Sequence, residues 1–208
     1  MKKVVALLPL TFIYLLTMAQ TDLDKKVEDY LKKHQREWHD YNVPYEDGKV
    51  LFDLIIKNKY QSALEIGTST GHSTIWLAWA MSKTGGKVIT IEINEQRHQE
   101  ALRNIKEAGL SDFVDARLGD AHALVKTLKG PFDFVFSDAD KDWYTQYFID
   151  VEPKLAVGGC FTAHNVSNGY QRNIRKFLDH VRKLPNFETT INKKSMSGIS
   201  ISYKKAEK

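Results

Sequence analysis

Acidic side chains follow a series of short apolar stretches in this sequence. They are, in chain order, Glu65, Glu92, Asp120, Asp138 and Asp140, and Lys141 comes directly after the last. Carboxylates suit a ligand that carries positive charge or sugar hydroxyl groups, and an amine beside them can move a proton. A solvated acid at a strand end is the ordinary alternative for each one alone, and Asp120 could equally cap a helix. The recurrence of the acids along the pattern is what indicates a site.

A turn with two glycines follows the first stretch, where residues 65–73 read EIGTSTGHS. Glycines let the backbone turn sharply and approach a ligand, and the helix after them offers free N–H groups. The glycines stand four positions apart and no GK[ST] follows, so the turn is neither a GxGxxG motif nor a phosphate loop. Glu65 also suits a positively charged ligand better than a pyrophosphate. The alternative is an ordinary tight turn beside a strand-end carboxylate.

A further apolar stretch, residues 157–166, reads VGGCFTAHNV and ends in two polar side chains, His164 and Asn165. Both are possible metal ligands, although they could also be the solvated end of a strand. Cys160 inside the stretch is the only cysteine, which excludes an intramolecular disulfide. Its apolar neighbours indicate a buried thiol rather than a nucleophile.

Five stretches rich in Val, Ile and Phe have the length of buried strands. They cover residues 63–66, 87–93, 113–117, 132–137 and 159–163. Helical stretches alternate with them, which predicts a parallel sheet covered on both faces. The carboxyl ends of such strands share one edge, where ligands bind. The acids, His164 and Asn165 should therefore lie together.

The helices between the strands are predicted to begin near His72, Asn94, Ala121 and Trp143. Asn94 is a suitable N-cap and Gly109 a suitable C-terminal stop. A last helix over residues 170–183 precedes strands over 187–191 and 198–203. The connection between those two strands is too short for a crossover helix, so they must pair antiparallel.

Two helices are predicted before the first strand. Apolar residues at helical spacing cover residues 22–39, with Asp22 as the cap, and a break at Asn42-Val43-Pro44 leads to a second helix. The residues before them form a separate segment with a basic start, an apolar run over 4–18 and small residues up to Ala19. This pattern is typical of an export signal. We expect residues 1–19 to be a signal peptide and residues 20–208 a single domain.

The leader predicts an exported protein, periplasmic or secreted, with no stable membrane span once it is cleaved. An uncleaved anchor is the second choice because the apolar run is short, and a cytoplasmic protein would follow if the segment is not a leader. The chain has 208 residues, 42% of them hydrophobic, which suits one core. The net charge of +4 comes from 30 basic and 26 acidic residues. That excess is too small to indicate nucleic-acid binding.

Several motifs together resemble a known family. They are EIGTSTGHSTIWLA, TIEIN, GDA, FDFVFSDADKDWYTQYF and PKLAVGG followed by NV. The chain is similar through these motifs to the class I S-adenosylmethionine-dependent O-methyltransferases that include catechol and caffeoyl-CoA O-methyltransferases. The resemblance covers nearly the whole chain after the leader. It implies a Rossmann-like α/β fold with a seven-stranded mixed sheet, mostly parallel with the last strand antiparallel, and often a homodimer.

The resemblance also implies roles for individual residues. Around the donor it places Val43, Glu65, Gly67 and Ser73 at the methionine end, Glu92 at the ribose, Asp120 and Ala121 at the adenine, and Asp138, Asp140 and Tyr147 nearby. Lys141 would be the general base, and Asp138 would bind a metal ion. Tyr144 and Tyr147 could equally be helix-face packing. His72 replaces the usual tyrosine and is expected to pack beside the donor rather than react.

The pair His164-Asn165 departs from the family, which usually has Asp-Asn as metal ligands there. An imidazole in place of a carboxylate disfavours Mg²⁺ and favours Mn, Fe, Ni or Zn, bound by Asp138, His164 and Asn165. Two other roles for His164 are a base or hydrogen-bond partner in a metal-free site, and a side chain merely satisfied at a strand end.

The function predicted is methyl transfer from S-adenosylmethionine to a hydroxyl group, phenolic or catechol-like, of a small molecule. Catalysis would use Lys141, Asp138 and His164. A non-catalytic nucleoside-binding protein in an exported compartment is the alternative, since the donor is made in the cytosol. A nicotinamide-dependent oxidoreductase is disfavoured by the missing GxGxxG motif. The acceptor pocket is expected near residues 168–170.

Overall fold

The computed structural model describes residues 8–38, 42–167 and 171–207, with side chains from residue 20 onward. The helices are α1 (Leu8–Lys33), α2 (Tyr45–Asn58), α3 (His72–Thr84), α4 (Glu95–Ala108), α5 (Ala121–Thr127), α6 (Tyr144–Val151) and α7 (Arg172–Arg182). The strands are β1 (Ser62–Ile66), β2 (Lys87–Glu92), β3 (Val114–Leu118), β4 (Phe132–Ser137), β5 (Leu155–His164), β6 (Phe187–Asn192) and β7 (Ile199–Lys204). Short 3-10 turns lie at Ser111–Phe113, Lys141–Trp143 and Glu152–Lys154.

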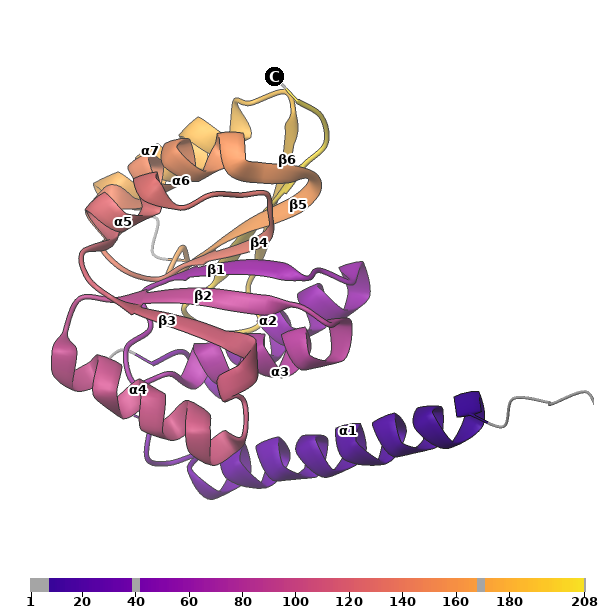
Figure 1. Cartoon of the computed structure of the whole chain (residues 1–208). Helices are drawn as coiled ribbons and strands as arrows, with labels where there is room; N and C mark the ends of the chain where they lie inside the picture. The colour runs from indigo at the N-terminus through magenta and orange to yellow at the C-terminus, as the bar shows by residue number, and fades with distance from the viewer. Residues whose placement is uncertain (1–7, 39–41, 168–170, 208) are drawn as a thin grey trace, which may run out of the picture.

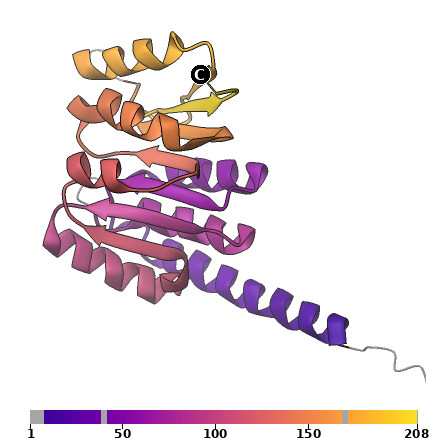
Figure 2. The same ribbon diagram turned by 45° about the horizontal axis from the view of Figure 1, so that its top comes forward.

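The strands form one seven-stranded sheet in the order β3-β2-β1-β4-β5-β7-β6 (Figures 1 and 2). The first five strands are mutually parallel, and β7 runs antiparallel to both β5 and β6. The predicted mixed sheet and the antiparallel final pair are confirmed. The chain reverses its direction of travel across the sheet between β1 and β4, so a crevice forms at the carboxyl ends of these strands.

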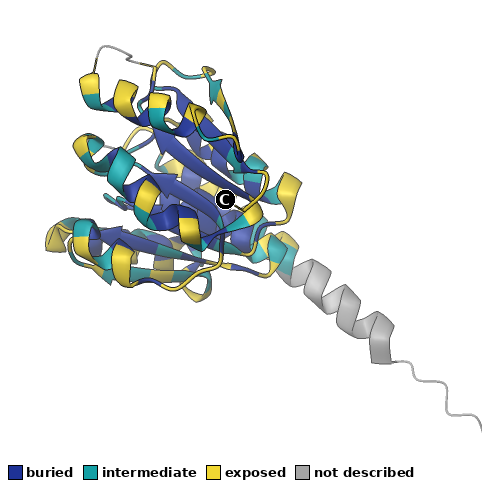
Figure 3. Cartoon of the chain, turned by 90° about the horizontal axis from the view of Figure 1, so that it is seen from above, coloured by how far each residue is buried: buried dark blue, intermediate teal, exposed yellow. Residues whose placement is uncertain are grey.

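Helices cover both faces of the sheet, and each face has its own apolar core. Side chains of α1, α2, α3 and α4 pack on one face, and those of α5, α6 and α7 on the other. Successive strand residues alternate between the cores, as in Phe134 and Phe136 against Val135 on β4. The sheet is accordingly buried between helices whose outer surfaces are exposed (Figure 3).

The predicted helix ends between the strands are confirmed. The Asn94 side chain accepts a hydrogen bond from the Arg97 backbone N–H at 2.9 Å at the start of α4. Gly109 ends the same helix with φ +81°, a conformation that glycine adopts without steric cost.

The predicted start and end of the first helix were wrong. It begins at Leu8 rather than at an Asp22 cap: Pro9 lies in its first turn, where proline is tolerated, and no glycine or proline follows between residues 10 and 22. It ends at Lys33 rather than His39, where a tight turn brings the Glu37 N–H to the His34 carbonyl at 2.9 Å. The nearby Asp24 ties the helix to α3, since it accepts hydrogen bonds from Trp79 and Lys83 at 2.7 and 2.6 Å.

Strand β5 is longer than predicted and begins at Leu155 instead of Gly159. Its pairing with β4 passes through a bulge, since Leu155 pairs with Phe132 and Cys160 with Phe134. Gly158 lies in this bulge with φ +84°, so the glycine pair bends the strand rather than preceding it. Cys160 is fully buried, as predicted.

In the part of the chain that the structure describes, no helix has both the length and the apolar character needed to cross a bilayer. The predicted leader remains a prediction.

Candidate active site

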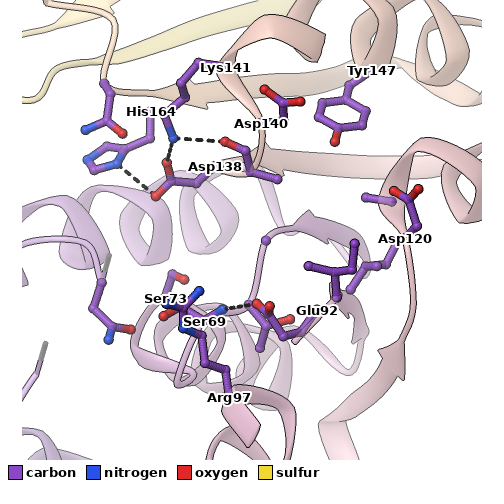
Figure 4. A pocket seen from close by; sticks show the side chains of 18 of the residues that line it. Ser69, Ser73, Glu92, Arg97, Asp120, Asp138, Asp140, Lys141, Tyr147 and His164 are labelled. Atoms are coloured by element: carbon purple, nitrogen blue, oxygen red, sulfur yellow. Dashed lines mark hydrogen bonds and ion pairs between the residues drawn. The ribbon is translucent and has the colours of Figure 1, made fainter. Parts of the chain in front are cut away.

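A cavity of about 730 Å³ opens at the carboxyl ends of the parallel strands, where the chain reverses across the sheet. Most of the predicted site residues line it. They are Gly67, Ser73, Glu92, Asp120, Ala121, Asp138, Asp140, Lys141, Tyr147, His164 and Asn165. Figure 4 shows that Glu92 and Ser69 lie on one side of the cavity, with Asp138, Lys141 and His164 opposite. The topology therefore brings the strand-end residues together, as the sequence predicted.

The turn between β1 and α3 forms the floor beside Glu92. Both carboxylate oxygens of Glu92 accept backbone hydrogen bonds, from Ser69 at 2.8 Å and from Asn94 at 2.9 Å. Gly67 has φ +102°, and a Cβ there would lie 2.9 Å from the Asp138 carbonyl oxygen. Glycine is required at position 67 because the backbone of the turn lies in close contact with the residues that follow β4.

The far end of the cavity is built around Asp120, which was predicted either as a helix cap or as an adenine contact. It caps α5, since its carboxylate accepts from the His122 N–H at 2.9 Å, and it also lines the cavity. The His122 ring stacks on Trp143 with 3.7 Å between centroids and lies 3.4 Å from Asp140. This end offers a flat aromatic surface beside carboxylates.

Four ionisable side chains form a connected line at the other end. The Lys141 ammonium donates to Asp138 Oδ1 at 2.5 Å. His164 Nδ1 lies 3.0 Å from Asp138 Oδ2, and His164 Nε2 lies 2.8 Å from Asp47 Oδ2. Burial opposes a charged ring, but the hydrogen bonds to Asp138 and Asp47 outweigh it and raise the pKa of His164 to about 9. Each ring nitrogen faces a carboxylate oxygen, which is the geometry of a doubly protonated ring.

This arrangement does not fit the predicted metal ligands. Ionised carboxylates only accept hydrogen bonds, so both ring nitrogens of His164 carry protons and neither has a lone pair for a metal ion. Both oxygens of Asp138 are also engaged by cationic donors. Among the residues that the structure describes, no cluster of three or more His, Cys, Asp or Glu side chains has metal-binding geometry. Asn165 lines the cavity with φ +58°.

Two residues that were predicted to contact the methyl donor, Glu65 and Val43, do not line the cavity. Glu65 is fully buried, and its Oε2 accepts from Thr74 and Thr90 at 2.5 and 2.6 Å. Desolvation raises the pKa of Glu65 to about 7 despite these hydrogen bonds. Val43 is also buried, and its carbonyl oxygen lies 2.8 Å from His72 Nδ1. Their donor contacts remain predictions.

The two tyrosines of α6 differ. Tyr147 lines the cavity. Tyr144 is fully buried, donates to the His164 carbonyl oxygen at 3.2 Å and lies 5.7 Å from the Phe177 ring, which is the packing role. His72 packs between Trp38 and Trp76 and is not among the residues that line the cavity, so its predicted place beside the methyl donor remains a prediction. The predicted acceptor-pocket residues Asn168, Gly169 and Tyr170 lie outside the described residues.

Several residues of the site were not predicted from the sequence. Asp47 of α2 contacts His164, and Arg97, His122 and Ser197 line the cavity. Asp47 is buried at 1% exposure, and Ser195 also donates to it at 2.8 Å. An acidic residue beside Gly48, on the apolar face of a helix, was the available signal.

Comparison with known proteins agrees with this geometry. The sequence profile of the O-methyltransferase family matches residues 19–176. Catechol O-methyltransferase from Niastella koreensis is 41% identical over 129 residues, which are 60% of this chain and 58% of that protein. Caffeoyl-CoA O-methyltransferase 1 from Eucalyptus globulus is 31% identical over 146 residues, 68% of this chain and 58% of that protein. The matches thus span less than two thirds of these relatives' length.

Solved structures match over more of their length. The O-methyltransferase from Bacillus cereus in complex with SAH has a TM-score of 0.72 and 28% identity, covering 89% of this chain and 91% of that one. The O-methyltransferase TomG from Streptomyces achromogenes in complex with SAM has a TM-score of 0.74 and 25% identity, covering 87% and 90%. The resemblance drawn from the motifs is confirmed, and the chain belongs to the O-methyltransferase family.

Proposed function

We propose that this protein transfers a methyl group from S-adenosylmethionine to a hydroxyl group, phenolic or catechol-like, of a small molecule. The observation that carries the proposal is that one cavity has Glu92 and Asp120 at one end and Lys141 at the other. Relatives named catechol and caffeoyl-CoA O-methyltransferase support the reaction class. The neighbouring structures in complex with SAH and SAM support the donor.

The donor is proposed to lie along the floor of the cavity. Glu92 is fixed by two backbone N–H groups and keeps further lone pairs, which can accept hydrogen bonds from the ribose hydroxyls. Asp120 and Ala121 would contact the adenine, with the His122 ring beside them. The sulfonium then points toward Asp138 and Lys141, where the charge of the carboxylate favours a cation.

Methyl transfer needs an acceptor oxygen in line with the sulfur–carbon bond. Lys141, which forms an ion pair with Asp138, first releases a proton to solvent. Its neutral amine then takes the proton of the acceptor O–H, and the oxygen lone pair forms the new bond to the methyl carbon. The old bond breaks with its electron pair on sulfur, which leaves a neutral thioether. Holding the acceptor oxygen in line with the sulfur–carbon bond lowers the barrier. The positive charge on sulfur and the negative charge that develops on oxygen also neutralise one another during the transfer. Asp138 holds the Lys141 side chain at the cavity wall.

We assign no step to a divalent ion at Asp138, His164 and Asn165. The ring nitrogens of His164 and the oxygens of Asp138 are committed to hydrogen bonds with one another, with Asp47 and with Lys141.

The proposal is tested by incubating the protein with methyl-labelled S-adenosylmethionine and a panel of catechols, single phenols and aliphatic diols. Label should move to a hydroxyl oxygen of the aromatic acceptors, with S-adenosylhomocysteine as coproduct. Donor binding without transfer to any acceptor would favour the nucleoside-binding alternative. Binding of NAD in place of S-adenosylmethionine would contradict the proposal outright.

A further inference from the structure

The side chains of Asp47, His164, Asp138 and Lys141 form one hydrogen-bonded line at the position where the family resemblance predicted metal ligands. Its members alternate in charge, from carboxylate to imidazolium to carboxylate to ammonium. The side chains of Asp47, His164 and Asp138 are only 2%, 4% and 7% exposed. Charges removed from water to this extent are stable only when they are paired and hydrogen-bonded.

The pairing explains why His164 and Asp47 occur together. A neutral imidazole could donate to only one carboxylate and would leave the other facing a lone pair. With both nitrogens protonated, His164 satisfies Asp47 on one side and Asp138 on the other. Asp47 also accepts a hydrogen bond from Ser195. It is therefore held both by β5, through His164, and by the loop between β6 and β7, through Ser195.

The same pairing engages the side chains of Asp138 and His164 that were predicted to bind a divalent ion. A metal ion needs oxygen or nitrogen lone pairs that converge on one point. Here an N–H group faces each carboxylate, and Lys141 takes the remaining oxygen of Asp138. A fixed positive charge thus lies between the two carboxylates, in the part of the cavity wall that His164 forms with Lys141 and Asn165.

We propose that the His164 imidazolium, clamped between Asp47 and Asp138, replaces the divalent ion, so that methyl transfer in this protein is independent of a metal. Asp47 is a positioning residue, which holds His164 and through it orients Asp138 and Lys141 toward the acceptor. This inference rests on the proposed function, but its central claim can be tested without turnover.

Metal binding is the first test, on the full chain without any substitution. After dialysis against EDTA, the protein is titrated with Mg²⁺ and Mn²⁺ by calorimetry, with and without S-adenosylmethionine. No stoichiometric binding is expected, and EDTA should leave turnover unchanged. Stoichiometric binding of either ion, or loss of turnover in EDTA that the ion restores, would overturn the inference.

A gain-of-metal variant is the second test. His164→Asp, alone or combined with Asp47→Asn, removes the imidazolium and completes a hard oxygen set with Asp138 and Asn165. The variant is expected to bind Mg²⁺ and to become sensitive to EDTA. A folded variant that binds no more Mg²⁺ than the wild type would count against the idea that the ring occupies the ion's position.

The role of Asp47 is tested by Asp47→Asn, with Asp53→Asn as the matched control, because Asp53 is an exposed residue of the same helix. Turnover should fall roughly 10–100-fold in the first variant, as is typical when a residue that orients a catalytic group is removed. The control should match the wild type. Nitrogen NMR of labelled histidine gives an independent readout, with the His164 resonances identified by their loss in His164→Gln. Two protonated ring nitrogens are expected in the wild type and one in Asp47→Asn; an unprotonated nitrogen in the wild type would overturn the inference.

These readouts separate the two proposals. If the protein binds S-adenosylmethionine but methylates nothing, the proposed function fails, while the calorimetry and the NMR still decide whether His164 occupies the metal position. If methyl transfer is found and requires a metal ion, the proposed function stands and the inference fails.

Discussion

At the residue scale, Glu92 shows how one side chain serves both the fold and the ligand. Its two oxygens hold the β1–α3 turn and the start of α4 through backbone N–H groups of Ser69 and Asn94. It is 6% exposed but still borders the cavity. A substitution here should therefore affect donor binding both directly and through the turn.

Glu92→Gln is expected to weaken binding of S-adenosylmethionine about 10–100-fold, since an amide N–H₂ must replace one acceptor oxygen opposite a backbone N–H. Calorimetric titration measures the change, with the exposed Glu107→Gln as the control. Unchanged affinity of the Glu92 variant for S-adenosylmethionine would show that the ribose does not bind Glu92.

Lys141 is the proposed base. Lys141→Ala should lower turnover by about 10²–10⁴-fold, which is the usual contribution of a positioned acid or base. Donor affinity should stay within the range of the wild type, because Lys141 lies at the acceptor end of the cavity. Single-turnover assays and calorimetry on the same sample separate the two effects, and a variant with full turnover would exclude Lys141 as the base.

His72 is expected to make the protein sensitive to acid. Burial lowers the pKa of His72 to about 4 from an unfolded value of 6.5, although the hydrogen bond to the Val43 carbonyl oxygen opposes the shift. The unfolded state binds the proton first, so stability present above pH 6.5 is lost as the pH falls toward 4, by at most about 3 kcal/mol.

Denaturant unfolding of the wild type and His72→Gln between pH 7 and pH 4 measures this effect. The stability difference between the two proteins should shrink as the pH falls. Comparison with the variant is needed because Glu65, with its raised pKa, changes stability in the opposite direction over pH 7 to 4.5. Parallel pH profiles would show that His72 titrates normally.

At the scale of elements, α2 and α3 pack unusually closely where Asp47 is positioned. A Cβ on Gly48 would lie 2.2 Å from Cδ1 of Trp76, so only glycine allows the two helices to approach. Asp47 is adjacent, and its distance to His164 depends on this contact.

Gly48→Ala should therefore destabilise the protein by about 1–3 kcal/mol through overpacking, or more if the helices cannot separate. Turnover should also fall, because the shift of α2 moves Asp47 away from His164. Thermal unfolding and turnover assays measure both effects, with the exposed Lys49→Ala as the neighbouring control. Normal stability would mean that the Trp76 ring can rotate aside.

The arrangement of the strands and helices also explains which site residues could be predicted from the sequence. Residues at the ends of β2, β4 and β5 converge because parallel topology requires it, so Glu92, Asp138 and His164 could be placed from the strand pattern. Glu65 differs because it lies within β1, where side chains alternate between the faces, and it turns into the layer of Thr74 and Thr90. Asp47 could not be placed, since its position depends on how α2 packs across the sheet.

At the scale of the whole molecule, the first nineteen residues are predicted to be dispensable for folding. The described contacts of α1 come from residues beyond the predicted leader, with Val27 and Leu31 fully buried and Asp24 bonded to α3. A chain that starts at residue 20 should keep the thermal midpoint of the full chain, whereas one that starts at residue 34 should unfold at a lower temperature.

The mass of the protein recovered from outside the cytoplasm of an expressing bacterium checks the leader itself. Cleavage near Ala19 is expected, and recovery of the uncleaved chain in the cytosol would contradict the export prediction. We expect the fold not to depend on this outcome, because the strands of the sheet and the described side chains of both cores come from residues after the leader.

The most direct test of the whole account is a crystal structure of the protein with S-adenosylhomocysteine. The account predicts that the ribose hydroxyls bind Glu92, that the adenine lies by Asp120 and that the sulfur faces Lys141. A nucleoside bound outside this cavity, or in it with the sulfur directed away from Lys141, would contradict the account.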